Sequence, residues 1–281
     1  MNAPASPPTW VLLRGLTRGA GHWGDFPVRL QQALPNARLI LPELPGNGVR
    51  HREVSPSRVP AMTEALRGTL QPVLKDGPVH VLALSLGAMV ACDWAARHPQ
   101  ELRGAVLVNT SLRPFSPLHH RLRPAAPLAL LRWLWRLRSA RGRALSGPAW
   151  EAELLGLTSA LAASQPLRAR AVLTHWEALR RTNPVSAANT LRQLWAAARY
   201  RAPLQPPTVP MLVLNGAADR LVNPACSQRL AQAWQLPLQA HSLAGHDLPL
   251  DDAAWVAQQV ARWSASLSPV TNWPDAARRP R

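Results

Sequence analysis

Ser85 is the residue of this chain best placed to act as a nucleophile. It follows an apolar strand-like stretch at residues 79–84 and precedes an apolar helix-like stretch at residues 86–97. A sharp strand-to-helix turn of this kind exposes a serine hydroxyl above a parallel sheet. Ala83 and Gly87 are small, as the turn requires, because the strand and helix backbones nearly touch there. The pattern predicts a serine nucleophile; the alternative is that Ser85 only caps the helix that follows it.

An acid and a base follow Ser85 along the chain. Residues 210–216 are typical of a buried strand that runs into a turn, and Asp219 lies just past its end. Residues 238–243 are typical of a second, short strand, and His246 follows it. Ligands bind at the carboxyl ends of strands in open parallel sheets, so the three loops can converge. A histidine can take the proton of an attacking serine while a carboxylate orients it, so the order predicts a Ser–His–Asp triad.

Other residues compete for the roles of acid and base. Asp219 could be an ordinary turn aspartate. His241 lies within a strand pattern, so we interpret it as a packed or edge residue, and His22 either shapes the pocket or fills it. Asn109 follows another strand pattern, but an amide cannot act as the acid. Asp219 and His246 therefore remain the favoured pair.

The serine, acid and histidine in this order resemble the α/β-hydrolase superfamily, in its branch of small serine esterases. The resemblance covers roughly residues 10–266. It implies a mostly parallel sheet of about six strands with helices on both faces. It also implies a serine hydrolase that cleaves a carboxylic ester through an acyl-enzyme, with no metal and no organic cofactor. Thioesterases, peptidases, lactonases and C–C hydrolases share the triad, so the resemblance leaves the bond open.

In this superfamily, two backbone N–H groups bind the oxyanion that develops on the substrate. By resemblance, these are the N–H groups of Leu16 and Leu86. The chain departs from the family pattern at two places, since Ala83 replaces the usual first glycine of the turn and Arg14–Gly15 replaces the usual His-Gly. The replaced histidine braces the oxyanion loop, so Arg14 affects the geometry of the loop and leaves the donor in place.

The resemblance divides the chain into a core, a cap and a tail. We expect the α/β-hydrolase core to comprise residues 1–110 and 206–267, and a helical cap to comprise residues 111–205. The cap is inserted between the sixth and seventh strands of the family and shapes the substrate pocket. We expect residues 268–281 to form a loose C-terminal tail.

Positive charge is concentrated in the predicted cap. The whole chain has a net charge of +17, and residues 111–205 hold 15 arginines and three acidic residues. Because 31 of the 32 basic residues are arginines, coding bias is one explanation. The other is an anionic substrate or an acidic carrier protein drawn to the cap. In the pimeloyl-carrier-protein methyl esterases, which this chain resembles in size and layout, cap arginines receive such a carrier. The candidates here are Arg132, Arg136 and Arg138.

Residues 128–138 alternate apolar side chains with arginines. Such a segment can lie on a membrane surface. A cap helix that faces the pocket would have the same pattern, and we favour this second interpretation.

Several other function classes fit the sequence less well. A sequence pI of about 11.8 would suit a nucleic-acid-binding protein, but the sequence contains no helix-turn-helix, zinc-finger or RNA-binding signature, so we expect no nucleic-acid partner.

The cysteines and the first residues of the chain bear on its compartment. Cys92 and Cys226 lack metal-ligand spacing, so we expect free thiols in a reducing compartment. The first residues lack a signal-peptide pattern, so we expect a cytoplasmic protein.

The alternative to an enzyme is a catalytically inactive binding module on a hydrolase scaffold. Such a module would usually have an incomplete triad, whereas all three candidate residues are present in this chain.

Overall fold

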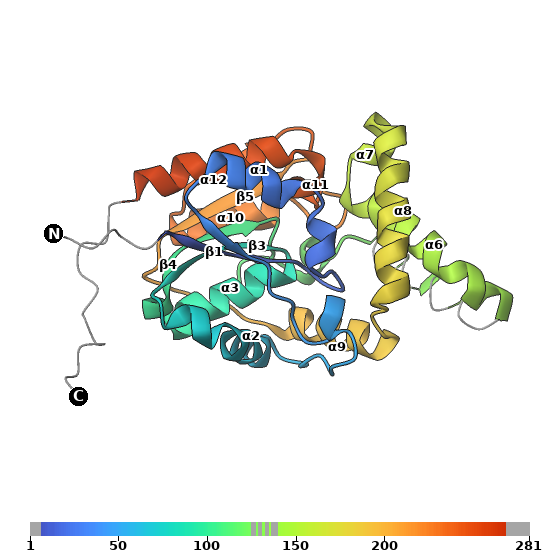
Figure 1. Ribbon diagram of the computed structural model, residues 1–281, viewed down its shortest axis with the longest axis horizontal. Coiled ribbons are helices and arrows are strands. Elements are labelled where there is room, and N and C mark those ends of the chain that lie inside the picture. Colours follow the sequence, from blue (N-terminus) through green and yellow to red (C-terminus); the bar gives the residue numbers. More distant parts are fainter. Residues whose placement is uncertain (1–6, 125–127, 129–130, 133–134, 136–139, 268–281) are drawn as a thin grey trace.

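A six-stranded parallel sheet forms the centre of the molecule (Figure 1). The computed structural model describes residues 7–267 except for 125–127, 129–130, 133–134 and 136–139; of residues 140–148 and 162 it describes the backbone alone. The strands lie in the order β2–β1–β3–β4–β5–β6, and every neighbouring pair is parallel, as predicted. They are β1 (Thr9–Leu13), β2 (Arg38–Ile40), β3 (Val79–Leu84), β4 (Leu102–Val108), β5 (Met211–Gly216) and β6 (Leu238–His241).

Helices cover both faces of the sheet, because successive side chains of a strand point to opposite faces. In β1, Trp10 and Leu12 are buried against α1 and α12, whereas Val11 and Leu13 are buried in the cluster that includes α2, α3 and α10. Figure 1 shows α1 and α12 above the sheet and α2 and α3 below it. These helices are α1 (Phe26–Ala33), α2 (Val59–Leu74), α3 (Leu86–Arg97), α10 (Ala225–Trp234) and α12 (Ala253–Ser266).

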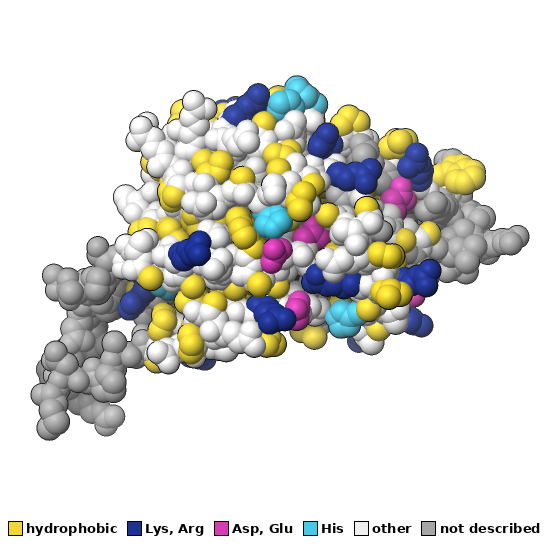
Figure 2. All heavy atoms as spheres, turned by 90° about the horizontal axis from the view of Figure 1, so that it is seen from above, with side chains coloured by type: hydrophobic (Ala, Val, Ile, Leu, Met, Phe, Trp, Pro, Cys, Tyr) yellow, Lys and Arg dark blue, Asp and Glu magenta, His cyan; other side chains and the backbone are white. Residues whose placement is uncertain are grey.

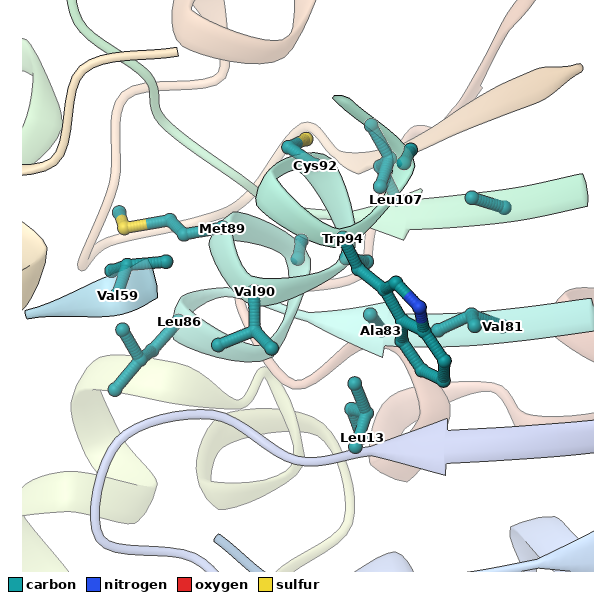
Figure 3. Packing of buried hydrophobic residues seen from close by; sticks show 14 of the residues in the cluster. Leu13, Val59, Val81, Ala83, Leu86, Met89, Val90, Cys92, Trp94 and Leu107 are labelled. Carbon is teal, nitrogen blue, oxygen red and sulfur yellow. The ribbon is translucent and has the colours of Figure 1, made fainter. Parts of the chain in front are cut away.

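The junction between β3 and α3 is tightly packed against β1. Figure 3 shows side chains of α3, among them Val90, over Leu13 of β1 and Ala83 of β3. A Cβ atom on Gly87 would lie 2.7 Å from the carbonyl oxygen of Arg14. The backbones can approach this closely because glycine has no side chain. Residue 85 is thereby held in a turn of fixed shape.

Helices between β4 and β5 lie at one end of the core. Figure 1 shows α6, α7 and α8 beside the core as a separate layer. Leu155, Leu161 and Trp176 hold these helices together, and Leu250 of α11 (Leu248–Asp251) joins the same apolar cluster. In contrast, α9 packs with Ala196 against the cluster of α3. The helices are α4 (Leu118–Arg121), α6 (Ala140–Thr158), α7 (Leu161–Ser164), α8 (Pro166–Thr182) and α9 (Ala187–Arg199).

The surface of the molecule is unevenly charged. Seen from the side of α1 and α12, Lys and Arg side chains are more numerous towards the end that carries α6 and α8 (Figure 2). None of the helices within the described residues is both long and apolar enough to cross a membrane.

We expect Gly87→Ala to lower the free energy of unfolding by about 1–3 kcal/mol, because the added methyl group overpacks the junction of β1 and α3. Urea unfolding followed by circular dichroism measures the change. Gly68→Ala is the matched control, since a Cβ at this exposed position of α2 meets no atom within 4 Å. Alanine there should stabilise the protein by up to about 1 kcal/mol. Equal stability of Gly87→Ala and the wild type would contradict the close packing.

Candidate active site

Ser85 lies at the junction of β3 and α3 in a strained backbone conformation. Its φ and ψ are 57° and −114°, a combination that non-glycine residues rarely adopt. Its N–H donates to the carbonyl of Val108 at the end of β4, with N and O 3.0 Å apart. Gly15 passes directly over it, since a Cβ on Gly15 would lie 3.1 Å from Cβ of Ser85. Such strain persists only where the surrounding packing imposes it, and it often marks a functional site.

The structure brings Asp219 and His246 together. Nδ1 of His246 lies 2.6 Å from Oδ2 of Asp219, and both side chains are buried. The other carboxylate oxygen, Oδ1, accepts from the N–H groups of Leu221 and Val222 at 2.8 and 2.9 Å. Because the carboxylate accepts the proton of Nδ1, Nε2 of the imidazole is left to accept a proton from another group.

Asn109 ties the loops around this pair to one another, a role that sequence reasoning missed. Its side-chain NH₂ donates to the carbonyls of Gly245 and His246 at 3.0 and 2.8 Å, and its Oδ1 accepts from the N–H of Gly216 at 2.8 Å. The residue has a positive φ of 46°, which asparagine tolerates better than most residues. The sequence feature that points to this role is the position of Asn109 directly after a strand, a position considered above only for the catalytic acid.

The loop after β1 provides the second half of the expected oxyanion site. The N–H groups of Leu16 and Leu86 have no hydrogen-bond partner within the described part of the chain. Leu86 is the first residue of α3, where N–H groups are free to bind an anion. The next N–H of the loop, that of Thr17, donates to Oε1 of Gln193 at 2.8 Å, so α9 holds the loop in place. Among the described residues, the N–H groups of Leu16 and Leu86 are therefore both free to donate.

No hydrogen bond among the described residues joins Ser85 to His246. In proteins without a bound ligand this contact is often long, and it tightens when substrate binds. The three residues follow β3, β5 and β6, whose carboxyl ends lie at the same edge of the sheet. The hydrogen bond from Ser85 to the end of β4 and those of Asn109 link the three loops.

Arg14 forms a buried ion pair where the family has a histidine. Its Nη1 and Nη2 donate to Oδ1 and Oδ2 of Asp247 at 2.9 and 2.6 Å. Its guanidinium carbon lies 4.8 Å from the ring centre of Trp23, within the range of a cation–π contact. By resemblance, a histidine at this position braces the loop after β1; here the guanidinium of Arg14 ties that loop to Asp247 through an ion pair.

Residues of α6 and α8 contact the loop after β1 at Arg18. Nη1 of Arg18 lies 2.7 Å from Oε2 of Glu151 in α6, and its guanidinium carbon lies 4.1 Å from the ring centre of Trp176 in α8. His22 packs against the same tryptophan, with ring centres 5.8 Å apart. Burial lowers the pKa of His22 well below its ordinary value, and the charges of Arg18 and Arg14 lower it further. His22 is therefore neutral and packed at this interface.

Of the three arginines predicted to contact an acidic partner, the structure describes Arg132. Arg132 is 57% exposed, and its Nη1 lies 3.4 Å from Oε1 of Glu153. Arg136 and Arg138 lie outside the described residues. His241, interpreted above as a packed or edge residue, is the last residue of the edge strand β6. Its Nε2 lies 3.2 Å from Oδ2 of Asp252. Within the described residues, no group of three or more His, Cys, Asp or Glu side chains could hold a metal ion.

Comparisons with known proteins show the family to which the chain belongs. The family model for the alpha/beta hydrolase fold matches residues 11–253. The chain is 30% identical over 245 residues to a pimeloyl-[acyl-carrier protein] methyl ester esterase of Aromatoleum aromaticum. The alignment covers 80% of this chain and 84% of that protein. Among solved structures, it is similar to the enol-lactonase of Burkholderia xenovorans LB400 (TM-score 0.73, 19% identity, 92% and 91% of the two chains covered). It is also similar to a thermophilic esterase of Thermogutta terrifontis (TM-score 0.69, 20% identity, 94% and 92% covered). This chain belongs to the α/β-hydrolase family.

Proposed function

We propose that the protein is a serine hydrolase that cleaves a carboxylic ester through an acyl-enzyme on Ser85. The observation that carries this proposal is the buried contact of 2.6 Å between Asp219 and His246, beside a serine in a strained turn. The carboxylate of Asp219 accepts two backbone hydrogen bonds in addition to the imidazole proton, so its position beside the ring is fixed. It stabilises the imidazolium that forms when the histidine takes a proton.

The reaction runs in two steps. Oγ of Ser85 attacks the ester carbonyl carbon while Nε2 of His246 takes the hydroxyl proton. The N–H groups of Leu16 and Leu86 donate to the oxyanion, which gains more from them than the neutral carbonyl does. Collapse of this intermediate expels the alcohol, which receives the proton from His246. A water molecule, activated by the same imidazole, then releases the acid and restores Ser85.

The names of the relatives support an ester as the substrate class. One is called a methyl ester esterase, another an esterase and the third an enol-lactonase. A lactone is a cyclic ester, so all three names refer to the same kind of bond. The solved structures are less than 25% identical to this chain and support the fold, so the ester proposal depends on the curated relative and on the site.

We also propose that the protein acts in the cytoplasm. Cys92 and Cys226 are both free and buried, as expected of a protein made in a reducing compartment. Burial raises the pKa of the Cys92 thiol, so it stays protonated and unreactive.

We expect a fluorophosphonate probe to label the wild type, and Ser85→Ala and His246→Ala to abolish labelling. The first variant removes the nucleophile, and the second removes the base that activates it. In-gel fluorescence measures labelling without knowledge of the natural substrate. A folded wild-type protein that is not labelled would contradict the proposal and favour a binding module on a hydrolase scaffold.

We expect Asp219→Asn to lower kcat for a p-nitrophenyl ester by about 10⁴-fold, because an asparagine side chain favours the wrong imidazole tautomer. Steady-state kinetics measures the loss. Asp252→Asn is the matched control, since Asp252 also contacts a histidine, His241, but lies outside the site. Its asparagine can still cap α12, so activity should stay within about twofold of the wild type. Similar losses in both variants would argue against a catalytic role for Asp219.

As a second candidate, we propose that the ester is presented by an acidic carrier protein that docks on the cap. The excess of 15 arginines over three acidic residues in 111–205 supports this, as does the name of the relative from Aromatoleum aromaticum. Arg132 is exposed on this part of the chain and is therefore accessible to a partner. Opposite charges attract a partner over a distance and raise its rate of association.

We expect kcat/KM for pimeloyl-[acyl-carrier protein] methyl ester to fall about tenfold or more between 50 and 500 mM NaCl, because salt screens attraction between exposed charges. For neutral p-nitrophenyl butyrate, it should change less than about twofold. Arg132→Glu should weaken turnover of the carrier substrate alone. Arg38→Glu is the matched control, since Arg38 is an exposed arginine at the amino end of β2. Equal salt dependence for both substrates would exclude the carrier candidate.

A further inference from the structure

A buried ion pair connects the loop after β1, which lies against Ser85, to the loop that carries His246. Arg14 and Asp247 share two hydrogen bonds, and each side chain is only 4% exposed. Arg14 stands two residues before Leu16, the expected oxyanion donor, and Asp247 directly follows His246. The pair therefore joins the loop that binds the oxyanion to the loop that carries the base, across 233 residues of sequence.

The geometry of the pair restricts how these loops can move. Two parallel N–H···O bonds between a guanidinium and a carboxylate fix orientation as well as distance. On the opposite side of its loop, Asp247 donates its backbone N–H to the carbonyl of Thr158 at 2.6 Å. Asp251, four residues further on, accepts from the hydroxyl of Ser159 and from the N–H of Gly245. The histidine loop is thus held between the cap and Arg14.

Stability alone is a poor explanation for this pair. Removing two charges from water is costly, and apolar residues of similar size often hold a protein together as well or better. Nε of Arg14 also lacks a hydrogen-bond partner among the described residues, which adds to that cost. An ion pair in this place is better explained by what its geometry and charge do for the neighbouring site.

Several charged groups lie around the loop of His246, so the loss of either member of the ion pair changes the net charge near the imidazole. Asp219 contacts the imidazole from the loop after β5, and Arg123 donates to the backbone carbonyl of Asp219 at 2.9 Å. Asp251 faces the same loop from α11, and burial raises its pKa. Without Arg14, the carboxylate of Asp247 would stand unpaired in the residue next to His246.

We propose that Arg14 and Asp247 are positioning residues of the active site, which align the oxyanion loop with His246 and balance charge beside the base. This inference rests on the proposed serine hydrolase function. The pair acts through its neighbours: alignment sets the rate of the chemical step, and charge balance sets the pH at which His246 loses its proton.

The test compares pH profiles of kcat/KM for p-nitrophenyl butyrate in Arg14→Gln, Asp247→Asn and the double variant. In Arg14→Gln, the unpaired carboxylate favours the imidazolium, so the acid limb should move up by about half a pH unit or more. In Asp247→Asn, the unpaired guanidinium disfavours it, so the acid limb should move down by a similar amount. In the double variant, the limb should return to its wild-type pH while kcat stays about tenfold or more below the wild type.

Arg14→Lys separates alignment from charge. Lysine keeps the positive charge and cannot form the two-pronged contact. We expect kcat to fall by about tenfold with KM within about threefold and the acid limb at its wild-type pH, because misplacement of reacting groups slows the chemical step. This variant also tests the proposal if Arg14→Gln fails to fold, since a wild-type kcat for Arg14→Lys would overturn the alignment role.

Arg67 and Glu101 supply the matched control. Nε of Arg67 donates to Oε2 of Glu101 at 2.7 Å and Nη2 contacts Oε1, so this pair is also two-pronged, but it joins α2 to η3 (Pro99–Glu101). Arg67→Gln and Glu101→Gln should lower stability and leave the pH profile and kcat unchanged. Acid limbs that do not move in opposite directions in Arg14→Gln and Asp247→Asn would overturn the charge-balance role.

The wild type separates this inference from the proposed function. If it neither hydrolyses the ester nor reacts with the fluorophosphonate probe, the proposed function fails and this inference fails with it. If the wild type is active and the Arg14 and Asp247 variants keep its rate and its pH profile, the inference alone fails.

Discussion

The near contact between β1 and the first turn of α3 is the constraint on which the rest of the structure depends. Gly87 lets the helix backbone lie against the carbonyl oxygens of Leu13 and Arg14, and Gly15 lets the following loop pass over Ser85. A side chain at either glycine would separate these segments. Because they touch, the strained conformation of Ser85 persists, and its side chain lies next to Gly15 of the loop after β1.

A close approach of two backbone segments also positions the loops that carry Asp219 and His246. A Cβ on Gly216 would lie 2.3 Å from the carbonyl oxygen of Gly245, so the histidine loop can rest directly on the end of β5. Asn109 then ties both segments to the end of β4 through three hydrogen bonds. A buried amide with its donors and acceptor satisfied rigidifies its surroundings, whereas a partly satisfied one would weaken them.

The helices between β4 and β5 take part in holding these loops. Glu151 binds Arg18 of the loop after β1, and Thr158 accepts from Asp247 of the histidine loop. Gln193 of α9 fixes the N–H that follows Leu16. Substitutions in these helices will therefore also act on the geometry of the loop after β1 and of the histidine loop. This coupling runs through hydrogen bonds of buried or half-buried groups, which water screens little.

The sequence by itself determined the parallel sheet, the strand-to-helix turn at Ser85 and the order of Ser85, Asp219 and His246. These features depend on apolar runs and on residues that follow them directly, so they can be seen in short stretches of the chain. Only the tertiary structure decided the role of Asn109 and the partner of Arg14. Asn109 contacts a residue 137 positions away and Arg14 one 233 positions away. A single sequence does not specify such pairs, because each depends on how strands, loops and cap pack against one another.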